Sequence, residues 1–231
     1  MKKLFIFMLA LTGVVTGNGQ EKSTTPDKPH FHGEFIFEPD TNYRSCHAST
    51  IVELPNGDLL AAWYAGTKEK AKDVAVLAAR LPKGGSQWTK PYVLADTPDH
   101  SEGNPVLFVD RSGTVWLFYM TMYTRFFFWR SWETCKIKFI KSSDNGYAWT
   151  SPEIFLDEYG WMVRNKAITL TNGDILLPVY DEREWSSTFM ISEDRGRTWQ
   201  RYGRLIVEEG RMIQPTVAQR SDGSLLAMMR R

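Results

Sequence analysis

The sequence predicts an all-β fold of the propeller class, in which a four-stranded antiparallel unit is repeated around a central channel. Three observations support this prediction. One hairpin pattern occurs four times, one aspartate-containing turn occurs twice, and the segments between them lack the 3.6-residue apolar rhythm of helices. The hydrophobic fraction of 42% and the aromatic fraction of 13% are sufficient for a substantial buried core.

Each hairpin begins with a polar residue at the head of a short apolar strand, turns at a glycine and continues into a second apolar strand. The heads are His47, Asn104, Lys166 and Gln214, and the turn glycines are Gly57, Gly113, Gly173 and Gly223. Asn-Gly, Ser-Gly and Asp-Gly between apolar runs are strong hairpin signals, because glycine readily takes the positive φ of a tight turn. The heads are spaced by 57, 62 and 48 residues. We therefore expect each repeat to be one propeller blade.

A second signature combines Ser, Asp, Gly and Trp in one turn, at residues 143–149 and 192–199. In such a turn the aspartate accepts hydrogen bonds from backbone N–H groups, the glycine takes a left-handed conformation and the tryptophan packs at the blade edge. Because every residue of the signature has a role within its own turn, we interpret these aspartates as structural rather than catalytic.

The N-terminal residues have the composition of a secretory signal. Lys2 and Lys3 precede an apolar run at residues 4–11, which is too short to span a membrane. We expect a signal peptide at 1–20, a linker at 21–30 and the propeller domain at 31–231, in a periplasmic or secreted protein. Cys46 and Cys135 are able to pair in an oxidising compartment, and the sequence leaves open whether they do.

The charge balance excludes some classes of partner. The 28 Lys and Arg residues against 27 Asp and Glu give a formal net charge of +1. This lacks the basic excess of proteins that bind nucleic acid or anionic membranes. The histidines lack the spacing typical of a zinc site, so we expect no metal and no other cofactor. The oligomeric state is not indicated.

Beyond the repeats, several motifs resemble those of the bacterial sialidase (neuraminidase) superfamily, in its Asp-box or BNR-repeat form. Tyr43-Arg44 occupies the place of the family's Tyr-Arg-Ile-Pro opening, and residues 57–62 resemble its Gly-x-Leu-Leu-Ala strand. Residues 172–180 resemble the third-blade strand pair. Residues 221–230 resemble the stretch that ends in the second member of an arginine triad.

The resemblance implies a six-bladed propeller, of which residues 31–231 supply about four blades. We expect the sequence to be a fragment, and the alternative is a natural short form with an incomplete ring. It also implies that Arg44 and Arg230 bind a substrate carboxylate and that Asp73 acts as general acid/base. Guanidinium groups suit the first role because their planar fork of donors matches a carboxylate. Sialidases of this family use a tyrosine nucleophile activated by a glutamate, an exception among glycosidases.

The head residues depart from the family pattern. Gln214 stands where the activating glutamate is expected, and a neutral amide cannot take a proton from a tyrosine. The heads His47, Asn104, Lys166 and Gln214, with Arg164 beside them, are expected to form a polar ring in the channel that binds an acidic sugar.

Three further side chains are candidates for catalysis. His47 is one of them, because an imidazole can act as an acid or a base. Glu182 follows a channel-lining strand and is a candidate carboxylate, as is Asp181, although ion pairing with Arg183 is an alternative role for either.

Together these features favour an exo-acting glycoside hydrolase of sialidase type, which releases a terminal acidic sugar such as sialic acid. Two alternatives stay open. One is a sialidase-like propeller that acts on a uronic-acid glycan as a lyase or another glycosidase, which His47 favours. The other is a non-catalytic glycan-binding propeller, which Gln214 favours.

Overall fold

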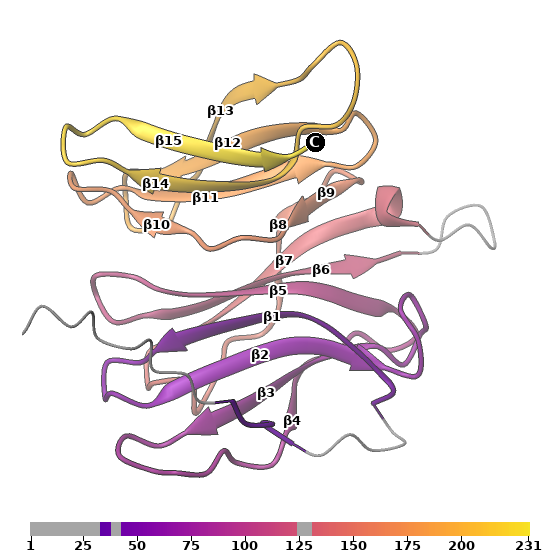
Figure 1. Cartoon of the computed structure of the whole chain (residues 1–231), viewed down its shortest axis with the longest axis vertical. Helices are drawn as coiled ribbons and strands as arrows, with labels where there is room; N and C mark the ends of the chain where they lie inside the picture. The colour runs from indigo at the N-terminus through magenta and orange to yellow at the C-terminus, as the bar shows by residue number, and fades with distance from the viewer. Residues whose placement is uncertain (1–32, 38–42, 124–130) are drawn as a thin grey trace, which may run out of the picture. The chain divides into compact units, whose positions relative to one another are not determined.

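The strands form successive antiparallel sheets (Figure 1) in a computed structural model that describes residues 33–37, 43–123 and 131–231. Contacts divide the chain into Met1–Glu34 and Phe35–Arg231, and all of the sheets belong to the second unit. The predicted signal peptide (1–20) and linker (21–30) lie outside the described residues. Within those that are described, no helix is long and apolar enough to cross a membrane.

Each sheet corresponds to one predicted repeat. The first contains β1 (Ser45–Glu53), β2 (Leu59–Gly66), β3 (Ala75–Leu81) and β4 (Tyr92–Ala95). The second contains β5 (Ser101–Val109), β6 (Val115–Met122), β7 (Cys135–Ser142) and β8 (Glu153–Leu156), with the short 3-10 helix η1 (Trp132–Thr134) before β7. The third contains β9 (Trp161–Val163), β10 (Ile168–Thr169), β11 (Ile175–Asp181), β12 (Ser186–Ser192) and β13 (Gln200–Leu205), and the fourth contains β14 (Ile213–Gln219) and β15 (Leu225–Arg230).

The four predicted hairpins are present, and each turns at its predicted glycine. The φ angles of these glycines lie between 83° and 101°, at Gly57, Gly113, Gly173 and Gly223. The hairpins are β1–β2, β5–β6, β10–β11 and β14–β15. Glycine takes this conformation without the steric penalty of a Cβ atom, so the turns are set by local sequence.

The aspartate-containing turns follow β7 and β12. In the second of them, Asp194 Oδ1 accepts hydrogen bonds from the N–H groups of Arg197 (3.0 Å) and Thr198 (2.8 Å). The first turn is arranged in the same way around Asp144. Its serine is Ser142, one residue before the predicted start at Ser143, because the Oγ of Ser142 accepts from the Gly146 N–H at 2.8 Å.

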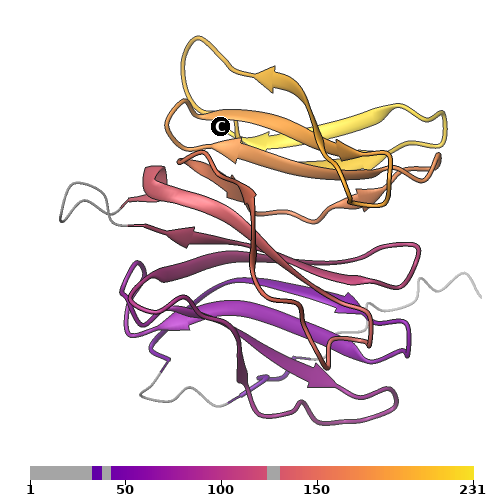
Figure 2. The ribbon, with the colours of Figure 1, turned by 180° about the vertical axis from the view of Figure 1, so that it is seen from behind.

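Apolar side chains from neighbouring sheets form the core. Leu60 and Val76 of the first sheet pack with Leu107 and Leu117 of the second. Figures 1 and 2 show that the sheets follow one another in chain order. Each fully buried leucine or valine contributes about 1.5–3 kcal/mol relative to an exposed one.

The second and third sheets are joined by a cluster of aliphatic and aromatic side chains. Trp116 and Phe118 of β6 are stacked with their ring centroids 5.5 Å apart. Trp199, which follows β12, meets both rings edge to face. The two cysteines lie apart from this cluster and form no disulfide: Cys46 is exposed and Cys135 is buried.

Candidate functional site

Residues from all four sheets line one cavity of about 310 Å³, here called the head pocket. In each hairpin we call the first strand the inner strand. The head pocket lies where the inner strands β1, β5 and β14 begin and where β2, β11 and β15, the second strands of their hairpins, end. Its lining residues are His47, Ala48, Tyr64, Glu69, Asn104, Trp132, Met162, Arg164, Tyr180, Glu182, Arg211, Gln214 and Arg230. Most of these side chains are polar or charged, so the pocket suits a hydrated ligand with many hydrogen-bonding groups.

Three lining residues each lie at a β-bulge, one in each of three inner strands. The strand pairing of β1, β5 and β14 shifts at Ala48, Asn104 and Gln214, whose φ angles are 54°, 44° and 56°. Each lies nine residues before the turn glycine of its hairpin. A bulge redirects a side chain, and positive φ in a residue other than glycine is strained, so the surrounding structure must hold these positions.

The third sheet presents a residue at the same place by interrupting its inner strand. β9 and β10 pair with the same edge of β11 and leave residues 164–167 between them. Arg164 lies nine residues before Gly173, so it is the counterpart of Asn104 and Gln214. The predicted heads Lys166 and His47 are offset from this position by two residues and one residue, respectively.

The second strand of each hairpin supplies a partner position. The residues seven positions after the turn glycines are Tyr64, Met120, Tyr180 and Arg230. All except Met120 line the head pocket. Tyr64 is paired across the strands with His47, and Arg230 with Ile213. The spacing of the repeat therefore marks Tyr64 and Tyr180, which are not among the site residues predicted from the sequence.

Tyr64 is held between a carboxylate and an imidazole. Its hydroxyl donates to Glu69 Oε1 at 2.8 Å, and its ring stacks on His47 with centroids 5.4 Å apart. Burial, followed by the bond to Glu69, raises the pKa of the Tyr64 hydroxyl. Nε2 of His47 lies 2.9 Å from Ser45 Oγ, so the imidazole is positioned from two sides.

Tyr180 also lines the head pocket and is only 1% exposed. The side-chain amide of Asn104 donates to its hydroxyl oxygen at 3.4 Å. Burial raises the pKa of the Tyr180 hydroxyl, and the nearby Gln214 amide opposes the increase in part. The Asn165 side chain in turn donates to the carbonyl of Gln214 at 2.9 Å, which fixes the bulge of β14.

Three arginines line the head pocket together with a half-buried carboxylate. Arg164 lies between β9 and β10, Arg211 lies just before β14, and Arg230 ends β15. Burial raises the pKa of Glu182, while Arg211 and Arg230 oppose the increase. The guanidinium of Arg211 lies 4.2 Å from the ring centroid of Trp185, which orients it by a cation–π contact.

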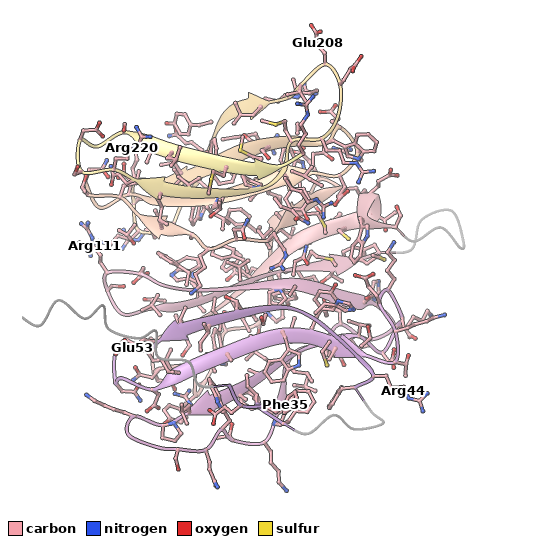
Figure 3. All side chains as sticks on the ribbon, in the orientation of Figure 1. Phe35, Arg44, Glu53, Arg111, Glu208 and Arg220 are labelled. Carbon is pink, nitrogen blue, oxygen red and sulfur yellow. The ribbon has the colours of Figure 1, made fainter. Side chains whose placement is uncertain are left out.

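The structure thus brings together six of the predicted site residues and leaves three outside the head pocket. Those that line the pocket are His47, Asn104, Arg164, Glu182, Gln214 and Arg230. Arg44 is exposed, and Figure 3 shows it projecting away from the start of β1. Asp73 accepts hydrogen bonds from the N–H and the hydroxyl of Thr67, both at 3.0 Å, and so closes a loop after β2.

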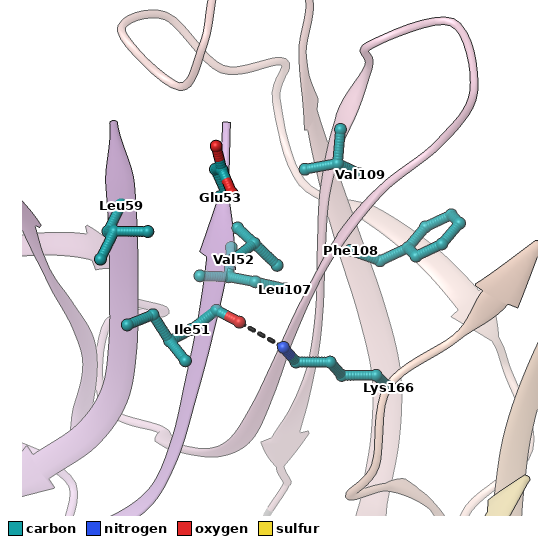
Figure 4. A pocket seen from close by; sticks show the side chains of 8 residues that line it. All are labelled: Ile51, Val52, Glu53, Leu59, Leu107, Phe108, Val109 and Lys166. Atoms are coloured by element: carbon teal, nitrogen blue, oxygen red, sulfur yellow. Dashed lines mark hydrogen bonds between the residues drawn. The ribbon is translucent and has the colours of Figure 1, made fainter. Parts of the chain in front are cut away.

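Lys166 lines a second cavity, of about 360 Å³, bounded mainly by apolar side chains of β1 and β5. Figure 4 shows its ammonium group bound to the carbonyl oxygen of Ile51. Lys166 therefore links the third sheet to the first rather than facing the head pocket.

Other lining residues come from loops, where the repeat gives no signal. Glu69 follows β2 and Arg211 precedes β14, whereas Trp132 belongs to η1. Their side chains reach the pocket only because distant segments of the chain converge there. Among the described residues, no group of three or more His, Cys, Asp and Glu side chains is arranged to hold a metal ion.

The model of the BNR repeat-like domain matches residues 57–231. No curated protein matches the chain. Solved structures give the fold: a Hadza microbial sialidase is 17% identical with a TM-score of 0.68 over 82% of this chain. A leech intramolecular trans-sialidase is 14% identical, with a TM-score of 0.70 over 87% of this chain. The intramolecular trans-sialidase of Ruminococcus gnavus is 15% identical, with a TM-score of 0.68 over 82% of this chain.

This chain spans 42%, 50% and 66% of the lengths of these three proteins. The low sequence identities make them a comparison of folds alone. They confirm the predicted all-β class and its sialidase type.

Proposed function

Because this chain belongs to the BNR repeat-like domain family, we propose that it is an exo-acting glycosidase of sialidase type that binds a terminal acidic sugar in the head pocket. The observation that carries the proposal is the convergence of Arg164, Arg211 and Arg230 on one cavity. These residues come from separate segments and face a pocket that also contains uncharged donors and acceptors. Such an arrangement matches a ligand that combines one carboxylate with several hydroxyl groups.

The positive charge of the head pocket is local. The whole chain has a formal net charge of +1, so attraction of an acidic ligand depends on the side chains that line the cavity. Glu69 and Glu182 oppose the three arginines in part. The carboxylate of Glu69 already accepts the Tyr64 hydroxyl, and burial favours the neutral form of Glu182. A ligand carboxylate therefore meets a net cationic environment.

A second candidate is action on a uronic-acid glycan, with His47 as acid or base. The different placements of Asp73 and His47 favour it. Asp73, the expected general acid, is bound within its own loop, whereas His47 lines the head pocket and stacks on Tyr64. An imidazole can supply acid/base chemistry near neutral pH without a carboxylate pair.

Release of an aryl group from an aryl sialoside tests the proposed function. We expect turnover by the protein and a decrease in kcat/KM of about 10–100-fold for Arg164→Ala, because a charge-assisted hydrogen bond contributes about 1.5–3 kcal/mol. Arg220→Ala is the matched control, since Arg220 is exposed next to the β14–β15 turn. Its kcat/KM is expected to stay within twofold of the unmodified protein.

The other outcomes separate the alternatives. Failure to cleave any sialoside, combined with cleavage of a uronic-acid glycan that is lost in His47→Ala, would replace the leading proposal by the second candidate. Binding of acidic sugars without turnover would instead indicate a glycan-binding module.

A further inference from the structure

The described residues place two carboxyl groups in the lining of the head pocket, and these differ in their contacts. Glu69 Oε1 accepts a hydrogen bond from the Tyr64 hydroxyl at 2.8 Å, so a protein donor already engages it. Glu182 is half-buried, and its carboxyl group forms no hydrogen bond or ion pair within the part of the chain that the structure describes. Buried polar groups ordinarily have partners, so the carboxyl group of Glu182 is the one left available to a ligand.

The backbone at the end of β11 directs Glu182 to the cavity. Successive side chains of a strand point to opposite faces, so Tyr180 and Glu182 project to one side and Asp181 to the other. Tyr180 and Glu182 both line the head pocket, whereas the two carboxylate oxygens of Asp181 bind the Arg183 guanidinium at 3.1 and 2.9 Å. The N–H of Glu182 donates to the Gly160 carbonyl at 2.9 Å, which fixes the backbone there. The ion pair with Arg183 therefore belongs to Asp181 and not to Glu182.

We infer that Glu182 is the general acid of the proposed glycosidase and gives its proton to the oxygen that leaves the acidic sugar. This role rests on the proposed function, because it requires a glycosidic bond in the head pocket. The bond between the anomeric carbon and this oxygen breaks, its electron pair stays on the oxygen, and the proton of Glu182 moves to the same atom. Water supplies the new hydroxyl group of the sugar, and the proton that this water loses returns to the Glu182 carboxylate.

The surroundings of Glu182 favour the protonated form that this role requires. Burial raises the pKa of the carboxyl group, because the charged form loses its hydration. Arg211 and Arg230 oppose the increase, as does Lys70 from the loop after β2, whereas Glu133 of η1 adds to it. The balance leaves the pKa above its ordinary value. Glu182 therefore keeps its proton to a higher pH than an exposed glutamate does.

Two other predicted acids are less suitably placed than Glu182. Asp73 accepts two hydrogen bonds within its own loop and does not line the head pocket. His47 lines the pocket, but its ring stacks on Tyr64 and its Nε2 lies 2.9 Å from Ser45 Oγ. Because an imidazole can also donate a proton near neutral pH, His47 is the rival that the experiment must separate from Glu182.

Paired methyl and 4-nitrophenyl glycosides of sialic acid and of glucuronic acid test this role. 4-Nitrophenolate can depart without a proton, whereas methoxide is a much stronger base and needs one as the bond breaks. We expect Glu182→Gln to lower kcat/KM by about 100-fold or more for the methyl glycoside of the sugar that is cleaved, because general acid catalysis contributes about 10²–10⁴-fold. For the 4-nitrophenyl glycoside of the same sugar the decrease should stay below about threefold.

Glu184→Gln is the matched control, because Glu184 lies between β11 and β12 like Glu182 but forms an ion pair with Arg204 outside the head pocket. Its kcat/KM should stay within twofold of the unmodified protein for both glycosides. A role of Glu182 in folding or in binding the sugar predicts equal losses for the two glycosides, since both carry the same sugar. Equal losses or no loss in Glu182→Gln overturn the inference, as does a loss confined to the methyl glycoside in His47→Gln but not in Glu182→Gln.

The pH dependence of the unmodified protein decides the matter should Glu182→Gln fail to fold. For the methyl glycoside, kcat/KM should decrease as the pH rises through the pKa of Glu182, because the proton-donating form is lost. The decrease should be smaller for the 4-nitrophenyl glycoside and should remain in His47→Gln. Its absence, an equal decrease for both glycosides, or its loss in His47→Gln overturns the inference.

Activity of the unmodified protein separates this inference from the proposed function. Cleavage of none of the four glycosides removes the proposed function and the role of Glu182 together. Cleavage of a 4-nitrophenyl glycoside but of neither methyl glycoside supports the proposed function and overturns the role of Glu182 alone, because a leaving group that needs a proton is then not released.

Discussion

The carboxylate of Asp194 organises the turn after β12 through four hydrogen bonds. The hydroxyl and the N–H of Thr198 supply the strongest contributions, and together the donors hold the pKa of Asp194 at about 2, below its ordinary value of 3.8. In the earlier turn Ala148 takes the place of Thr198, so Asp144 lacks the threonine hydroxyl and keeps the hydroxyl of Ser142 as a donor. The N–H of Ala148 and this hydroxyl lower the pKa of Asp144 as well.

Asp194→Ala is therefore expected to lower the free energy of unfolding at pH 7. A carboxyl whose pKa is depressed in the folded state stabilises the fold above its unfolded pKa and loses that contribution as the pH falls. The difference between variant and unmodified protein should thus be full above about pH 4 and shrink toward pH 2. Urea unfolding at several pH values measures it. Glu193→Ala, at the neighbouring position, is expected to show no such trend.

Single residues of the site were predictable where the repeat marks them. Asn104 and Gln214 stand at the bulges, and Arg230 ends the hairpin that resembles the family stretch. Arg44 and Asp73 were assigned from the resemblance, and in the structure Arg44 is exposed and Asp73 is bound within its own loop. Asp73 accepts hydrogen bonds from Thr67, six residues earlier in the chain. A linear sequence motif does not show that this contact forms.

At the scale of elements, the aspartate-containing turns also connect one sheet to the preceding one. A Cβ atom on Gly196 would lie 2.5 Å from the Trp116 ring of the second sheet. A Cβ atom on Gly146 would lie 3.4 Å from both Leu60 and Arg80 of the first sheet. The glycine of each turn therefore serves two purposes: it permits positive φ, and it leaves space for a side chain of the neighbouring sheet.

Gly196→Ala is expected to destabilise the protein by about 2–5 kcal/mol. Left-handed backbone costs a residue with a Cβ about 1–2 kcal/mol, and overpacking against a buried ring adds about 1–3 kcal/mol. Gly203→Ala separates these terms, because Gly203 has a φ of 70° and no atom within 4 Å of an added Cβ. Thermal unfolding should show the larger loss for Gly196→Ala. Equal losses would show that the contact with Trp116 is unimportant.

Hairpins, turns and their order were predictable because each depends on residues close together in the sequence. The exact head of each inner strand was not. The extra residue of a bulge shifts which side chain enters the pocket, so Ala48 rather than His47 is the counterpart of Asn104. Likewise, the interruption of the third inner strand selects Arg164 over Lys166.

At the scale of the molecule, function depends on where the sheets converge. Arg211 and Glu69 lie in loops of different sheets and meet only in the head pocket, so sequence spacing alone could not place them there. With a formal net charge of +1, the chain has little long-range attraction for an anion. The head pocket itself must therefore distinguish a charged sugar from a neutral one.

Calorimetric comparison of sialic acid with its methyl ester, and of glucuronic acid with its methyl ester, tests this requirement most directly. We predict that the unmodified protein binds one of the acids at least about tenfold more tightly than its ester, because the ester lacks the charge that the guanidinium groups recognise. In Arg164→Ala this preference should decrease markedly. Equal affinity for acid and ester, or a preference unchanged by Arg164→Ala, would contradict the assignment of the head pocket as an acidic-sugar site.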